Sequence, residues 1–69
     1  MREIETSKGR FVVCNKTDNS FLGLICKHEP IKLSEVTEEE LYNETEITYS
    51  MLHFKGIEIT QNTYIFKVN

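Results

Sequence analysis

Turn-forming dipeptides divide this chain of 69 residues into short apolar segments. Glycine and asparagine adopt the positive φ that tight hairpin turns require, so such dipeptides favour hairpins. The dipeptides are Lys8-Gly9, Asp18-Asn19, Lys55-Gly56 and Gln61-Asn62. β-Branched and aromatic residues dominate most of the segments between them. The pattern predicts strands near residues 2–7, 10–16, 21–28, 46–54, 57–60 and 63–68.

The middle of the chain carries the signature of a helix. Thr37 with Glu40 fits a capping box, and Val36 with Leu41 fits a hydrophobic staple. Acidic residues in the first turn suit the positive end of the helix dipole. We therefore predict one short helix over residues 38–44.

The resulting element order is β-β-β-α-β-β-β, with Pro30 as the break after the third strand. This order resembles an oligonucleotide/oligosaccharide-binding (OB) barrel, and a small SH3-like barrel fits almost as well. The resemblance is one of topology only, because no ribonucleoprotein-type motif accompanies it. We expect a mainly β (α+β) fold, a six-stranded meander barrel or sandwich, as one domain over residues 1–69. The length is too short for two domains.

The last three expected strands have one apolar and one mixed face. Turns at residues 55–56 and 61–62 fix the register that sorts the side chains. The apolar face, expected as core, holds Leu52, Phe54, Ile57, Ile59, Tyr64, Phe66 and Val68. The mixed face reads either as an ordinary solvated surface or as a patch for a partner or a second copy. The candidate partner-binding residues on that face are Ile47, Tyr49, Met51, His53 and Ile65.

The hairpin expected from residues 10–16 and 21–28 is apolar on both faces. A strand pair of this kind must be covered on both sides. In so short a chain, the remaining elements cover both sides or another subunit covers one. Homo-oligomerisation is therefore an alternative that the sequence leaves open.

Two cysteines and two histidines are the residues with catalytic or metal-binding potential. Cys14 and Cys26 are expected on opposite faces of the first hairpin, too far apart for the Cβ separation of a disulfide. We expect two reduced, buried thiols. A zinc site would need them to converge with His28 and His53, and the spacing supplies only one weak ligand pair. We expect no enzyme, metal or cofactor, and leave the roles of Cys26 and His28 open.

The net charge of −3 conceals an acidic cluster. Its members are Glu35, Glu38, Glu39, Glu40, Glu44 and Glu46. They are either the solvated, capping face of a helix or an anionic surface that steers the protein to a basic site, such as one that normally holds nucleic acid. We include Glu38, Glu39 and Glu40 among the candidate partner-binding residues. Nucleic-acid binding is disfavoured, because no basic stripe is present.

Composition sets the expected location and origin. No apolar run reaches the ~18 residues of a membrane span, and residues 1–5 lack a signal-peptide core, so we expect a cytoplasmic protein with no membrane contact. Alanine is absent, and Ile, Lys and Asn are abundant, a bias associated with AT-rich genomes. The leading hypothesis is a non-enzymatic protein-binding module: a small phage or mobile-element accessory or inhibitor protein that acts on a host protein, in the host cytoplasm. The alternatives are a homo-oligomeric virion or assembly component and a small nucleic-acid or nucleotide-binding barrel.

Overall fold

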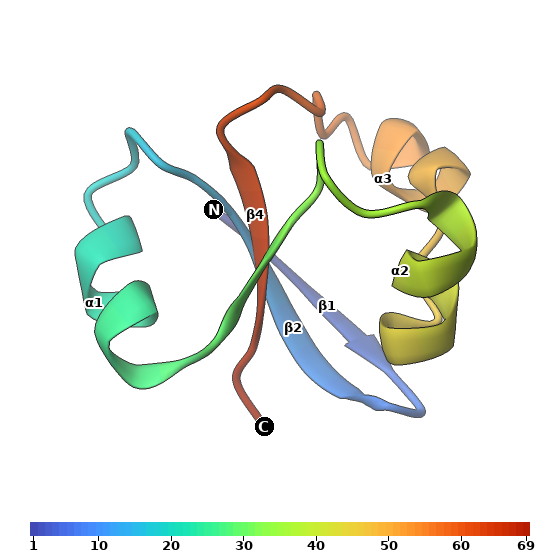
Figure 1. Cartoon of the computed structure of the whole chain (residues 1–69), viewed down its shortest axis with the longest axis horizontal. Coiled ribbons are helices and arrows are strands. Elements are labelled where there is room, and N and C mark those ends of the chain that lie inside the picture. Colours follow the sequence, from blue (N-terminus) through green and yellow to red (C-terminus); the bar gives the residue numbers. More distant parts are fainter.

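One open, four-stranded antiparallel sheet forms the centre of the computed structural model, which describes residues 1–69 (Figure 1). The strands are β1 (Arg2–Thr6), β2 (Gly9–Asn15), β3 (Pro30–Lys32) and β4 (Thr63–Lys67). The helices are α1 (Phe21–Lys27), α2 (Glu38–Thr45) and α3 (Tyr49–Phe54). The spatial order of the strands is β1-β2-β4-β3. The fold is α+β, and the expected six-stranded barrel or sandwich, with the order β-β-β-α-β-β-β, is wrong.

The β1–β2 hairpin and α2 follow the local sequence signals, although the hairpin turn lies one residue before the expected Lys8-Gly9. β1 pairs with β2 in a register that places Ile4 opposite Phe11, with a turn at residues 7–8. The predicted capping box starts α2: the Thr37 hydroxyl accepts a hydrogen bond from the Glu40 N–H at 3.2 Å, and the Glu40 carboxylate accepts one from the Thr37 N–H at 3.2 Å. Both elements are decided within a few residues, so sequence reasoning identifies them.

The segment 21–28, predicted as a strand, forms α1 instead. A short apolar run fits either element, because its hydrophobicity has no diagnostic period. The preceding turn decides between them. The Asp18 carboxylate accepts a hydrogen bond from the Ser20 N–H at 2.8 Å, and the Asp18 carbonyl accepts one from the Phe21 N–H at 3.1 Å. These bonds start a helical turn where a hairpin was expected.

The second expected meander is also absent. Residues 46–54 contain α3, which begins because the Thr48 hydroxyl accepts a hydrogen bond from the Met51 N–H at 3.1 Å. Residues 57–60 pair with no strand, and the two isoleucines among them pack half-buried against the core. β4 lies inside the sheet, between β2 and β3.

Pro30 begins β3, although the sequence predicted a break there. Proline is tolerated at the first position of an edge strand, because the strand can lack that N–H without losing the ladder. Pro30 lies opposite Phe66, and Ile31 lies opposite Ile65. A three-residue strand thus closes the far edge of the sheet.

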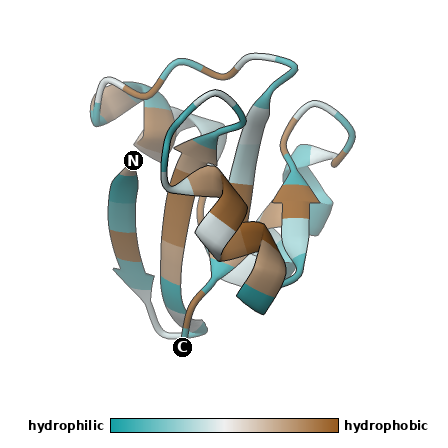
Figure 2. Ribbon diagram, turned by 90° about the vertical axis from the view of Figure 1, so that its left-hand side faces the viewer, coloured by the Kyte–Doolittle hydropathy of each residue, from teal (hydrophilic) through white to brown (hydrophobic).

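Helices cover both faces of the sheet (Figure 1). α2 and α3 cover one face over a core of eight buried residues. These are Ile4, Phe11, Val13, Leu33, Leu41, Ile47, Leu52 and Ile65. α1 alone covers the other face, seen in Figure 2, over Val12, Cys14, Phe21 and Phe66. No helix has both the length and the apolar character needed to cross a membrane.

Candidate functional site

The acidic segment 35–46 contains α2 and the residues that flank it. Several carboxylates of this segment have partners inside the protein. Glu35 forms an ion pair with Lys32, with 3.3 Å between the carboxylate oxygen and Nζ. Glu46 ends α2 with a φ of 64° and accepts hydrogen bonds from the Ser7 N–H, at 3.1 Å, and from the Ser7 hydroxyl. These two carboxylates hold neighbouring segments together.

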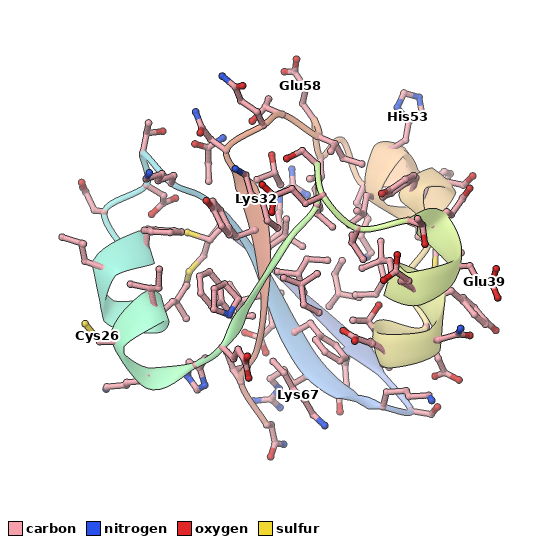
Figure 3. The ribbon with its side chains drawn as sticks, in the orientation of Figure 1. Cys26, Lys32, Glu39, His53, Glu58 and Lys67 are labelled. Atoms are coloured by element: carbon pink, nitrogen blue, oxygen red, sulfur yellow. The ribbon has the colours of Figure 1, made fainter.

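Glu40 also has a structural role, whereas its neighbours on α2 are free. Its carboxylate accepts hydrogen bonds from the Thr37 hydroxyl and N–H, and these bonds lower the pKa of Glu40 because they favour its charged form. Glu38 and Glu39 are exposed and form no hydrogen bond or ion pair through their side chains. Glu39 points away from the sheet (Figure 3). The free carboxylate of Glu39 is therefore on the outer side of α2, whereas the carboxylate of Glu44, also without an ion pair, lies in the groove described below.

Three large apolar side chains are exposed on the same two helices. The exposed fractions are 91% for Phe54, 50% for Tyr42 and 37% for Met51. Met51 and Phe54 are three residues apart on α3, so they are neighbours on the helix surface. Aromatic residues and methionine are enriched at protein interfaces. We define the α2–α3 surface as the exposed residues Glu38, Glu39, Tyr42, Met51 and Phe54. His53 is also exposed on α3, on the side away from Met51.

The mixed sheet face predicted from the sequence is not formed, and its residues are dispersed. Ile47 and Ile65 are fully buried in the larger core. Tyr49 is half-buried, and its hydroxyl lies 2.8 and 3.2 Å from two carbonyl oxygens in the connection between β3 and α2. Met51 and His53 are exposed, because helix α3 turns them away from the sheet. Partner binding by this set of five residues stays a prediction, and Met51 and His53 are its exposed members.

Two surface aromatics escaped sequence reasoning. Phe54 was expected in the core, since a strand would place it on the same face as Leu52. In a helix, residues two apart do not share a face, and Phe54 points outward while Leu52 is buried. Tyr42 belongs to neither the expected core nor the expected partner-binding residues. It follows the inward-facing Leu41 of α2, so the helical period could have identified it.

The cysteines and histidines do not converge. Cys14 is buried beneath α1, and burial raises the pKa of its thiol. Cys26 is exposed on α1 (Figure 3), so the expectation of two buried thiols is wrong for this residue. Both thiols are free. His53 and Glu58 lie at one end of the molecule without an ion pair between them (Figure 3). No three His, Cys, Asp or Glu side chains are arranged to hold a metal ion.

An open groove of about 770 Å³ lies where α1 ends and β3 begins. Its polar rim consists of Lys27, His28, Glu29, Glu44 and Lys67. Cations and carboxylates therefore share the groove, and neither sign dominates it. No cysteine or serine lines the groove, so it holds no Cys or Ser nucleophile beside His28.

Comparisons with known proteins add no relative. No protein-family model matches the chain, and neither a curated protein nor a solved structure matches it. Only the surface of the molecule therefore points to a function. The α2–α3 surface combines exposed interface-type side chains with free carboxylates, which the groove does not.

Proposed function

We propose that this chain is a non-enzymatic protein-binding module and that the α2–α3 surface contacts its partner. The observation that carries the proposal is the exposure of Phe54 beside Met51 on α3. An aromatic side chain left in water forgoes roughly 1.5–3 kcal/mol of burial free energy. Seating Phe54 in a pocket of a partner recovers that energy, as central aromatic residues of interfaces do.

The free carboxylates of the α2–α3 surface define the charge of the partner. Glu38 and Glu39 have no cation to neutralise them within the protein. A basic surface on the partner, such as a site that normally holds nucleic acid, complements them and speeds association. The absence of alanine and the abundance of Ile, Lys and Asn favour a phage or mobile-element origin. With that origin, the partner is a host protein in the host cytoplasm, and the chain acts on it as an accessory or inhibitor protein.

Photo-crosslinking tests which surface meets a partner. A benzophenone amino acid replaces Phe54 in one variant and the exposed Asn19, in the turn between β2 and α1, in the matched control. We expect a crosslinked product from position 54 in a lysate of low-GC bacteria. Excess unlabelled protein should compete the product away, and Glu38→Lys with Glu39→Lys should reduce it. Equal products from both positions, or none from position 54, would contradict the proposal.

A second candidate function, self-assembly, is favoured by the outer side of α1. Leu22 is 73% exposed and Ile25 is 41% exposed, although Phe21 on the inner side is buried. A helix that is apolar on both sides is typical of a buried element. A second copy of the chain could cover it, as a virion or assembly component requires. Light scattering at micromolar concentration should then show an oligomer that Leu22→Ser dissociates, and a strict monomer would remove this candidate.

A further inference from the structure

The outer edge of β1 carries backbone groups that no part of the protein uses. β1 is an edge strand and pairs only with β2. In an antiparallel pair, alternate residues direct both N–H and C=O to the neighbouring strand, and the residues between them direct both groups away. An edge strand therefore offers a row of free donors and acceptors.

Hydrogen bonds on the far side of β2 show which residues of β1 face outward. The Val68 N–H donates to the Arg10 carbonyl at 2.9 Å, so the peptide groups of Arg10 face away from β1. Arg10 lies opposite Glu5. Glu5, and Glu3 two residues earlier, therefore direct their N–H and C=O groups to the open edge. No hydrogen bond outside the sheet ladder reaches these four groups.

Contacts at both ends hold β1 in place. The Arg2 guanidinium donates to the Lys55 carbonyl, with 2.9 Å between Nη1 and the oxygen. At the other end, the Ser7 N–H donates to the Glu46 carboxylate at 3.1 Å. The strand is thus ordered before any partner arrives, which lowers the entropic cost of binding at its edge.

The opposite edge of the sheet, at β3, offers fewer free backbone groups than the β1 edge. The Leu33 N–H donates to the Thr63 carbonyl at 3.0 Å, which leaves Pro30 and Lys32 facing outward. Pro30 has no N–H, and the Lys32 carbonyl already accepts the Glu35 N–H at 3.1 Å. β3 offers an incoming strand one donor and one acceptor, so the β1 edge is where a ladder can continue.

A second copy of β1 does not suit this edge. Antiparallel self-pairing in any register centred on residues 3–5 places a glutamate directly opposite a glutamate of the other copy, and like charges in that position destabilise a sheet. Arg10 neutralises only the charge of Glu3, with 3.1 Å between its Nε and the Glu3 carboxylate oxygen. Glu5 has no ion-pair partner. The edge therefore complements a strand that brings a cation.

We propose that the β1 edge binds an extended segment of another protein as an added antiparallel strand, with lysine or arginine opposite Glu5. The backbone ladder supplies affinity, and the cross-strand charge pair supplies specificity. This site goes beyond the α2–α3 surface, and either site can exist without the other.

The test is an NMR titration of isotope-labelled protein with a synthetic peptide. The peptide has about eight residues, alternates lysine with valine and is capped at both ends. The amide signals of Glu3 and Glu5 shift, and their hydrogen exchange slows. A peptide with glutamate in place of lysine binds roughly two- to fivefold more weakly or worse, because its charges oppose Glu5. A lysine–valine peptide methylated on the backbone nitrogens that face β1 keeps its charge and loses roughly tenfold or more in affinity.

Substitutions at one position separate backbone from charge. Glu5→Pro removes an outward N–H without removing a bond to β2, so the protein stays folded and loses roughly tenfold or more in peptide affinity. Glu5→Gln keeps the N–H and loses roughly two- to fivefold. Glu29→Gln, directly before β3 at the opposite edge of the sheet, serves as the charge-matched control and leaves the affinity unchanged. If Glu5→Pro does not fold, the methylated peptide with the unaltered protein makes the same test.

Three outcomes would overturn the proposal: no shift at Glu3 and Glu5 with millimolar lysine–valine peptide, equal binding of the methylated and unmethylated peptides, or shifts confined to α2. None of them depends on the crosslink from Phe54, so failure at the edge and failure at the α2–α3 surface are distinguishable.

Discussion

Eight buried residues lie between the sheet and the α2–α3 layer, whereas four lie between the sheet and α1. The starts of the helices also favour the α2–α3 layer. Thr37 and Thr48 accept capping hydrogen bonds at the starts of α2 and α3, but the Ser20 side chain accepts no capping bond at the start of α1. α1 also contains Gly23, which costs about 1 kcal/mol relative to alanine in a helix.

The difference teaches where the stability of this small domain resides. A helix that has few buried apolar contacts and no side-chain bond from its N-cap residue is the kind of element that opens locally, without unfolding the rest. Only Phe21 among the residues of α1 is buried. We therefore expect α1 to be the least stable helix and the α2–α3 face to determine global unfolding.

The largest expected effect comes from the α2–α3 core. Leu52 is fully buried there, so Leu52→Ala should cost ~2–5 kcal/mol. A core of this size supplies only ~3–5 kcal/mol, so much of the protein should be unfolded at 25 °C. Leu22→Ala on α1 is the matched control and should stay within ~0.5 kcal/mol. Urea denaturation followed by circular dichroism measures both, and equal losses would break the comparison between the faces.

Phe21→Ala should have a smaller effect that is confined to α1. The Phe21 ring packs edge-on against Tyr64 and Phe66, with centroids 5.0 and 5.7 Å apart. Its loss should cost less than the ~3–5 kcal/mol typical of a core Phe→Ala change, because α1 can detach while the sheet persists. Alkylation of Cys14 beneath α1 should accelerate, while the exposed Cys26 reacts as before. A Cys14 that stays protected until global unfolding would show that α1 belongs to the same cooperative unit.

Removing the N-cap hydroxyl should lower the free energy of unfolding by about 1 kcal/mol more at α2 than at α1. Thr37→Ala deletes the hydroxyl that accepts the Glu40 N–H, and such a deletion typically costs ~1 kcal/mol. Ser20→Ala deletes a hydroxyl with no capping bond and should stay within ~0.5 kcal/mol. Thermal unfolding of both variants measures the difference. A costly Ser20→Ala would mean that the start of α1 is stabilised in solution by a bond absent here.

Gly23→Ala should strengthen the weaker face. A Cβ at position 23 would meet no atom within 4 Å, so the added methyl group meets no steric obstacle. Alanine in place of glycine should stabilise α1 by ~0.5–1 kcal/mol. Cys14 should then be alkylated more slowly than in the unaltered protein. An unchanged rate would show that opening of α1 does not control access to Cys14.

Sequence reasoning succeeded where a few neighbouring residues decide the structure. The hairpin of β1 and β2 and the capping box at Thr37 are both local. It failed at residues 21–28 and 46–54, where apolar and β-branched residues fit a strand as well as a helix. There, Asp18 and Thr48 accept hydrogen bonds from nearby N–H groups, and these bonds start helices. Once one strand was misassigned, every later pairing partner was wrong as well.

The candidate site was predictable only in part for the same reason. The acidic residues Glu38 and Glu39 are exposed on the helix that was expected. Ile47 and Ile65 were placed on the surface, because a strand register alternates faces, and both are buried. Phe54 was placed in the core for the converse reason. Surface and core exchange places when a strand becomes a helix.

Acid should reveal the smallest difference between the two faces. The Thr37 hydroxyl and N–H lower the pKa of Glu40, whereas the Ser20 N–H and the N-terminal amine lower the pKa of Asp18 at the start of α1. A lowered pKa in the folded state means that the stabilisation is present above the unfolded carboxyl pKa, about 4, and is lost as pH falls through the folded value. The stability difference between the unaltered protein and Glu40→Gln should therefore be constant from about pH 7 to 5 and shrink below about pH 4.

Asp18→Asn provides the matched measurement at α1. Its stability difference should shrink over the same acidic range, because the pKa of Asp18 is also lowered. The readouts should differ: loss of the Asp18 contribution speeds hydrogen exchange of the α1 amides, since α1 opens, whereas loss of the Glu40 contribution shifts global unfolding in urea. A Glu40→Gln effect that grows as pH falls would have the wrong sign and would show that the capping bond does not favour the carboxylate.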